Sequence, residues 1–251
     1  MDTALATLLT TVALDAALAG RLSPDDCAQA LLDSGFPVPL VLEDAVYASD
    51  PPTGLLLLLP ALRAAGVDRL RLSLLHPMFP SPVPRVDRAD RRTLARATAV
   101  AVSEVRGTAH AVLVLDGEAN LRVLACAPVT YAPLDALSVP EAARTLREVV
   151  MEGLAVVEAV GDAAPAHLRN LQWRDWQADM SGDAPRAALS ALLRRPEHAP
   201  VLHAALDIHH AMSPVLAPAT VEPPEFGAVL ARLHAAAAAV VTAVTRDNGI
   251  G

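Results

Sequence analysis

The stretch Ala109-His-Ala-Val-Leu-Val-Leu115 is followed by Asp116-Gly-Glu-Ala-Asn120 and then by Leu121-Arg-Val-Leu-Ala-Cys-Ala127. Two apolar segments of strand length thus flank five residues that contain the turn-forming pair Asp-Gly, a pattern typical of a β-hairpin. Because a hairpin alone cannot bury its apolar face, we expect further strands and covering helices in the same chain.

Two more strands are expected upstream of this hairpin. Residues 69–74 alternate in polarity with a period of two, which is typical of a half-buried strand. Residues 37–43 begin with prolines, which favours a strand at a sheet edge. Helices are expected at 3–19, 24–34, 55–65, 88–105 and 140–160, and a glycine follows each of them as a stop signal.

Strand signals almost disappear after Gly161. Helices are expected at 165–180, 185–195, 200–212 and 224–246, separated by segments rich in Pro, Gly or Ser. The sequence therefore predicts an α/β (or α+β) fold, with a sheet of about four short strands over residues 36–127 covered by helices and a helical C-terminal half. We expect an α/β domain at 1–161 and a helical region at 162–251, which is either separate or packed on the same core.

The composition excludes several classes of protein. With 251 residues, 53% hydrophobic and 19% charged, the chain is long and apolar enough to fold around a core rather than remain disordered. The net charge of −8 argues against a nucleic-acid-binding protein, which needs basic contacts to phosphates. All 20 basic residues are arginines, so Schiff-base chemistry on lysine is excluded.

The N-terminal residues are apolar but do not resemble an export signal. They lack a positively charged start, and Asp2 and Asp15 bracket the apolar stretch. No segment reaches 18 uninterrupted apolar residues, because Arg232 and His234 interrupt the longest candidate. We therefore expect a cytoplasmic protein with no membrane partner. Cys27 and Cys126 are expected to be free thiols.

A candidate metal site lies in the predicted helix 200–212. His203, Asp207 and His210 are spaced i, i+4 and i+7, which places them on one helix face, whereas His209 lies off this stripe. Two imidazoles and a carboxylate are suitable ligands for zinc or another divalent transition metal. The alternative is that these side chains are exposed, or bonded to Asp207, without any metal.

Four candidate interaction residues lie elsewhere. Met78 and Phe79 belong to an arm with four prolines between Pro77 and Pro84, which is expected to be extended and able to dock a partner. Trp173 and Trp176 are spaced i, i+3 and form either a packing face or a stacking platform.

Three weaker signals concern charged or titratable groups. His76 follows a predicted strand, and Glu43 and Asp44 form a pair of acids at the end of another. Among the arginines of the segment 85–96, those at positions 85, 88, 92 and 96 would share a helical face. They would form an anion or acidic-partner site or, because Asp87 and Asp90 dilute the charge, a solvated surface.

Two functions from different classes remain open. The first is a non-catalytic regulatory or protein-interaction protein that acts through apolar helices and the proline-rich arm. Its partner would be another protein or a second copy, and we expect a homodimer, because the apolar N-terminal and last helices indicate either full burial or an interface. The alternative is a metal-dependent hydrolase that uses the His203, Asp207 and His210 face, with Glu197 or Glu222 as general base.

Overall fold

The computed structural model describes residues 3–47, 53–76, 83–130, 137–160, 184–212 and 224–248. Its strands form one mixed sheet in the order β2-β1-β6-β5-β4-β3, in which only β1 and β6 are parallel. The strands are β1 (Leu40–Asp44), β2 (Thr53–Gly54), β3 (Arg69–Leu74), β4 (Ala99–Val105), β5 (Thr108–Leu115) and β6 (Asn120–Ala125). The mixed α/β fold is confirmed, with six strands rather than about four.

The expected hairpin is formed by β5 and β6, with Leu115 paired to Leu121. Its turn is held by the Asp116 carboxylate, whose Oδ1 accepts hydrogen bonds of 2.9 Å from the backbone N–H groups of Glu118 and Asn120. Side-chain capping of this kind is the reason that Asp begins so many turns.

The expected helix 88–105 is wrong. Only Arg91–Leu94 forms a helix, α4, whereas Ala99–Val105 form strand β4 between β3 and β5. Alanine favours helices in isolation, which favours a helix when this segment is considered by itself. In the sheet, Ala99 and Ala101 pack on the large core while Val100 and Val102 pack on a second, smaller one. A strand buried on both faces is apolar throughout and gives no polarity signal.

The other helices lie close to their expected positions. Three helices precede the sheet's edge strand β3 in the chain: α1 (Thr3–Leu18), α2 (Pro24–Asp33) and α3 (Leu55–Ala64). The helices after the last strand, β6, are α5 (Val139–Val160), α7 (Ala184–Leu192), the short η3 (Pro196–His198), α8 (Ala199–Met212) and α9 (Pro224–Asn248). The expected helix 165–180 and the expected domain boundary near 161 lie outside the described residues.

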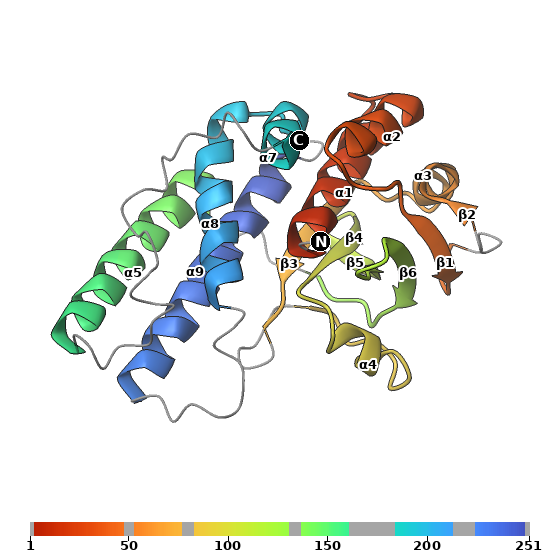
Figure 1. Ribbon diagram of the computed structural model, residues 1–251. Helices are drawn as coiled ribbons and strands as arrows, with labels where there is room; N and C mark the ends of the chain where they lie inside the picture. The colour runs from red at the N-terminus through yellow and green to blue at the C-terminus, as the bar shows by residue number, and fades with distance from the viewer. Residues whose placement is uncertain are drawn as a thin grey trace.

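Helix α1 lies on the sheet, against β3, β4 and β5, and nearly all its residues are buried. Helices α5 and α8 each pack against α9 at the β3 edge of the sheet, and α9 runs beside β3 (Figure 1). One core cluster contains residues of α1, the sheet and these C-terminal helices. The apolar character of α1 is therefore accounted for by burial within a single chain.

Strand β3 ends the sheet, and helices cover its outer edge. The Leu72 N–H donates to Thr245 Oγ1 of α9 at 3.4 Å, and the Leu72 carbonyl accepts from Thr242 Oγ1 at 3.4 Å. The Leu70 N–H donates to Asp15 Oδ1 of α1 at 3.0 Å. The unpaired backbone groups of an open strand edge can pair with another chain. These contacts occupy backbone groups of β3 and so protect this edge from such aggregation.

The stretch Gly227–Asn248 of α9 has the length and composition of a membrane span, with a mean hydropathy of 1.7. Half of it is buried within the protein, where α9 packs on α5, α8 and β3. A core helix of this kind passes the same test of length and composition as a membrane span.

Candidate interaction surface

The structure does not group the three predicted metal ligands. His203 is buried, whereas Asp207 and His210 are exposed. The Asp207 carboxylate is paired with the Arg186 guanidinium of α7. Within the ranges that the structure describes, no three His, Cys, Asp or Glu side chains are arranged to hold a metal ion. The metal site remains a prediction without geometric support.

Three other histidines form a buried row that spacing along the chain did not predict. The ring of His234 in α9 lies 5.0 Å from that of His76, at the end of β3, and 5.7 Å from that of His209 in α8. Burial, and secondarily the neighbouring His209 and His76, lower the pKa of His234 to about 4. Burial also lowers the pKa of His76, so both of these rings are neutral at pH 7. The available signal in the sequence was His234 itself, a titratable residue in an alanine-rich helix.

The predicted acid pair at the end of β1 has structural partners. Glu43 Oε2 accepts from Arg122 Nη1 of β6 at 2.7 Å. Asp44 Oδ1 accepts from the backbone N–H groups of Val46 and Tyr47 at 2.9 and 2.7 Å. These contacts hold the end of the strand.

The four predicted interaction residues, Met78, Phe79, Trp173 and Trp176, lie outside the described residues. Of the two cysteines, Cys27 is buried, Cys126 is half-buried and both are free. Burial raises the pKa of the Cys27 thiol to about 11, so this thiol is protonated and poorly reactive at neutral pH.

A group of large apolar side chains is exposed at the β1 end of the sheet. It comprises Leu32 of α2, Leu40 and Leu42 of β1, and Leu57 of α3, which we call the leucine surface. Helix α2 contacts α3, and α3 contacts β1, so the elements that carry these leucines adjoin one another (Figure 1). Leu57 lies on the helix-covered side of the sheet, whereas Leu40 and Leu42 face its other side, so the leucines flank the β1 edge from both sides. Large exposed apolar side chains near one another are typical of binding surfaces.

The leucine surface lies in a strongly acidic part of the chain. Residues 23–64 contain six Asp or Glu residues and one Arg, a net charge of −5 out of −8 for the whole chain. Asp33 directly follows Leu32 and is exposed, whereas Glu43, which follows Leu42, is paired with Arg122. The leucines therefore lie in a segment that is acidic overall.

Local structure explains how these leucines become exposed. Helix α3 begins directly after the short strand β2 and buries Leu55, Leu58, Leu59 and Leu62 on one face, which turns Leu57 outward. In β1 the side chains alternate, so Val41 enters the core while Leu40 and Leu42 face the other side. The sequence alone did not single out these leucines, because a run of five leucines has no polar face to set its phase.

Comparison with models of protein families, with curated proteins and with solved structures finds no match for this chain.

Proposed function

We propose that this protein is a cytoplasmic, non-catalytic regulatory or interaction protein that binds a protein partner with its leucine surface. The observation that carries the proposal is the exposure of Leu32, Leu40, Leu42 and Leu57 on adjoining elements at one end of the sheet. Burial of this apolar area would drive association, at about 25 cal/mol per Å² removed from water.

Charge complementarity favours a particular kind of partner. Because the segment that carries the leucines is acidic overall, the complementary surface is apolar with basic residues nearby. A second copy of this chain would bring two acidic segments together. A hetero-partner is therefore favoured over the homodimer expected from the sequence, since the burial of α1 removes one of the reasons for expecting a homodimer.

The test compares two variants that differ in position but not in exposure. Leu57 is 66% exposed and Met151, on α5, is 64% exposed, so Leu57→Gln and Met151→Gln remove similar apolar areas. Leu57→Gln is called the leucine variant, and Met151→Gln is its control. Proteins captured by the wild type are purified and titrated against all three proteins by calorimetry.

The proposal is supported if the affinity for the purified partner falls by about tenfold or more in the leucine variant alone. Equal affinity for all three proteins contradicts it. Sedimentation of the protein alone, at low and high salt, tests for a second copy at the same surface. A dimer that dissociates in the leucine variant would support the interface and overturn the charge argument.

The hydrolase alternative relies on His203, Asp207 and His210, which the structure does not bring together. Elemental analysis of the purified protein tests it directly, because a stoichiometric transition metal would reverse the order of the two functions.

A further inference from the structure

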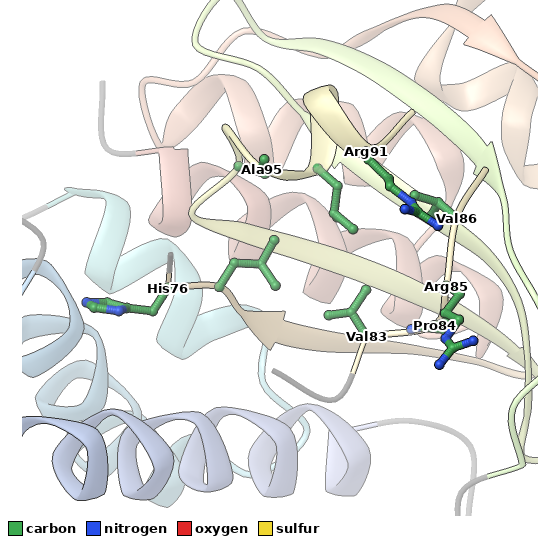
Figure 2. A pocket seen from close by; sticks show the side chains of 10 residues that line it. His76, Val83, Pro84, Arg85, Val86, Arg91 and Ala95 are labelled. Carbon is green, nitrogen blue, oxygen red and sulfur yellow. The ribbon is translucent and has the colours of Figure 1, made fainter. Parts of the chain in front are cut away.

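The face of the sheet opposite α1 carries a pocket of about 470 Å³ (Figure 2). Three segments surround it: the end of β3 with His76, residues 83–86, and α4 with the turn that follows it. This size lies in the range of small-molecule sites in proteins. The pocket shares no residue with the leucine surface, so a ligand bound in it is independent of the proposed function.

The walls of the pocket are apolar. Leu75, Val83 and Leu94 line it and pack on the small core of the second sheet face, which includes Val86 and Val100. Because this core supports the walls, the apolar lining is part of the folded structure. The lining suits the apolar body of a ligand.

Two arginines give the pocket a charged end. Figure 2 shows Arg85 and Arg91 at one end of the pocket and His76 at the other, with the His76 ring directed towards the helices. Both arginines are exposed, and among the described residues neither guanidinium group has a hydrogen-bond or ion-pair partner. Guanidinium groups bind carboxylates and phosphates through paired hydrogen bonds.

A second hollow strengthens the positive charge around α4. It measures about 380 Å³, and its charged lining residues are three arginines, Arg92, Arg96 and Arg122, and one carboxylate, Asp116. It shares Ala97 with the first pocket. Arg122 is neutralised by Glu43, but Arg92 and Arg96 have no carboxylate partner within the part of the chain that the structure describes. In a chain of net charge −8, this local excess of positive charge favours the approach of anions.

We propose that the pocket between β3 and α4 binds a small amphiphilic anion, with the anionic head at Arg85 and Arg91 and the apolar body against Leu75, Val83 and Leu94. The opposite end contributes no positive charge at neutral pH, because His76 is buried against His234. One anionic head and one apolar tail therefore fit the pocket better than a molecule charged at both ends.

The test uses ligands with the same apolar body and different heads. Octanoate, octyl phosphate, octanol and octylamine are titrated calorimetrically against the full chain, and acetate serves as the head without the body. The proposal requires binding of octanoate or octyl phosphate and much weaker binding of octanol, octylamine and acetate. The stronger of the two anions identifies the head as a carboxylate or a phosphate.

Three variants locate the binding. Arg85→Gln and Arg91→Gln are each expected to lower the affinity for the anion about tenfold, because each removes a charge-assisted hydrogen bond. Arg88→Gln is the control, since Arg88 is exposed on the same segment but does not line the pocket. Melting temperatures verify that every variant is folded. Equal binding of octanol and octanoate, or an equal loss in Arg88→Gln and Arg91→Gln, would overturn the proposal, as would no binding of either anion.

Discussion

Asp15 Oδ1 in the middle of the core accepts a 3.0 Å hydrogen bond from the backbone N–H of Leu70 on the edge strand β3. The same carboxylate lies 3.4 Å from Asn248 Nδ2, at the C-terminal end of α9. Burial raises its pKa to about 6, although the Leu70 hydrogen bond and the nearby Arg21 and Arg69 act in the opposite direction. One buried side chain thus joins the first helix, the sheet edge and the last helix.

Replacing Asp15 tests this junction. Asp15→Ala leaves the buried Leu70 N–H without an acceptor and should lower the free energy of unfolding by about 1–3 kcal/mol. Asp15→Asn retains an acceptor oxygen and removes a charge that is costly to bury. It should therefore lower the free energy of unfolding by less than Asp15→Ala does. Urea denaturation at pH 7 measures both. The exposed Asp33→Ala serves as control, with an expected change within about 0.5 kcal/mol. Equal losses in Asp15→Ala and Asp15→Asn would show that the hydrogen bond is unimportant.

Asp15 and His234 should have opposite effects on stability in acid. The Asp15 pKa is raised from 3.8 to about 6, so protonation stabilises the folded state as pH falls from 6 to 3.8. The His234 pKa is lowered from 6.5 to about 4, so the folded state loses stability as pH falls through this range. Each shift corresponds to about 3 kcal/mol, and the two largely cancel in the wild type.

Single variants should reveal the two contributions. His234→Leu removes the histidine contribution, so its free energy of unfolding should rise as pH falls from 6 to 4, relative to the wild type. Asp15→Asn removes the opposing contribution and should show a steeper fall over the same range. Denaturation curves at pH 4, 5, 6 and 7 measure both. Parallel pH profiles for the wild type and the two variants would contradict the assigned shifts.

Arg71 and Glu104 form a buried ion pair across β3 and β4, with Arg71 Nε 2.9 Å from Glu104 Oε1. Arg71 also donates to Ser73 Oγ at 2.9 Å. Glu104→Leu alone should cost about 3–5 kcal/mol, because it leaves a buried positive charge without its partner. Arg71→Met combined with Glu104→Leu should recover most of that loss, as thermal denaturation can show. A double variant as unstable as the single one would mean that the pair itself stabilises the fold.

Melting temperatures can test whether α8 binds zinc. If His203, Asp207 and His210 bind zinc, added zinc should raise the melting temperature, and His203→Ala and His210→Ala should each abolish the effect. His209→Ala should retain it. Because Asp207 is paired with Arg186, we expect no zinc effect in any of the four proteins. A stabilisation specific to the predicted face would revive the hydrolase alternative.

The proline-rich arm can be tested independently. If Met78 and Phe79 anchor a partner, replacing both with serine should weaken association and leave the melting temperature nearly unchanged. Calorimetric titration against the purified partner, together with thermal melts, distinguishes the outcomes. A large drop in melting temperature with unchanged association would assign these side chains to the core.

The sequence by itself determined the features that depend on neighbouring residues. The Asp116 turn specified the β5–β6 hairpin, and the Ser23-Pro24 start of α2 appears as a capping box in which Ser23 Oγ accepts from the Asp26 N–H at 3.1 Å. These motifs can be recognised in the sequence because their hydrogen bonds form within a few residues of the chain.

Only the tertiary structure decided the conformation of Ala99–Val105 and the composition of the sites. The local helical propensity of alanine was overridden by pairing with β3 and β5. The histidine row contains residues from the end of β3, from α8 and from α9. The pocket at Arg85 and Arg91 is formed by the end of β3, residues 83–86 and α4, whereas the sequence grouped Arg85 with Arg88, Arg92 and Arg96 on one helix face. Spacing along a helix predicts neighbours only within that helix. Contacts between distant segments depend on how the whole chain packs, because burial and backbone pairing outweigh local preferences.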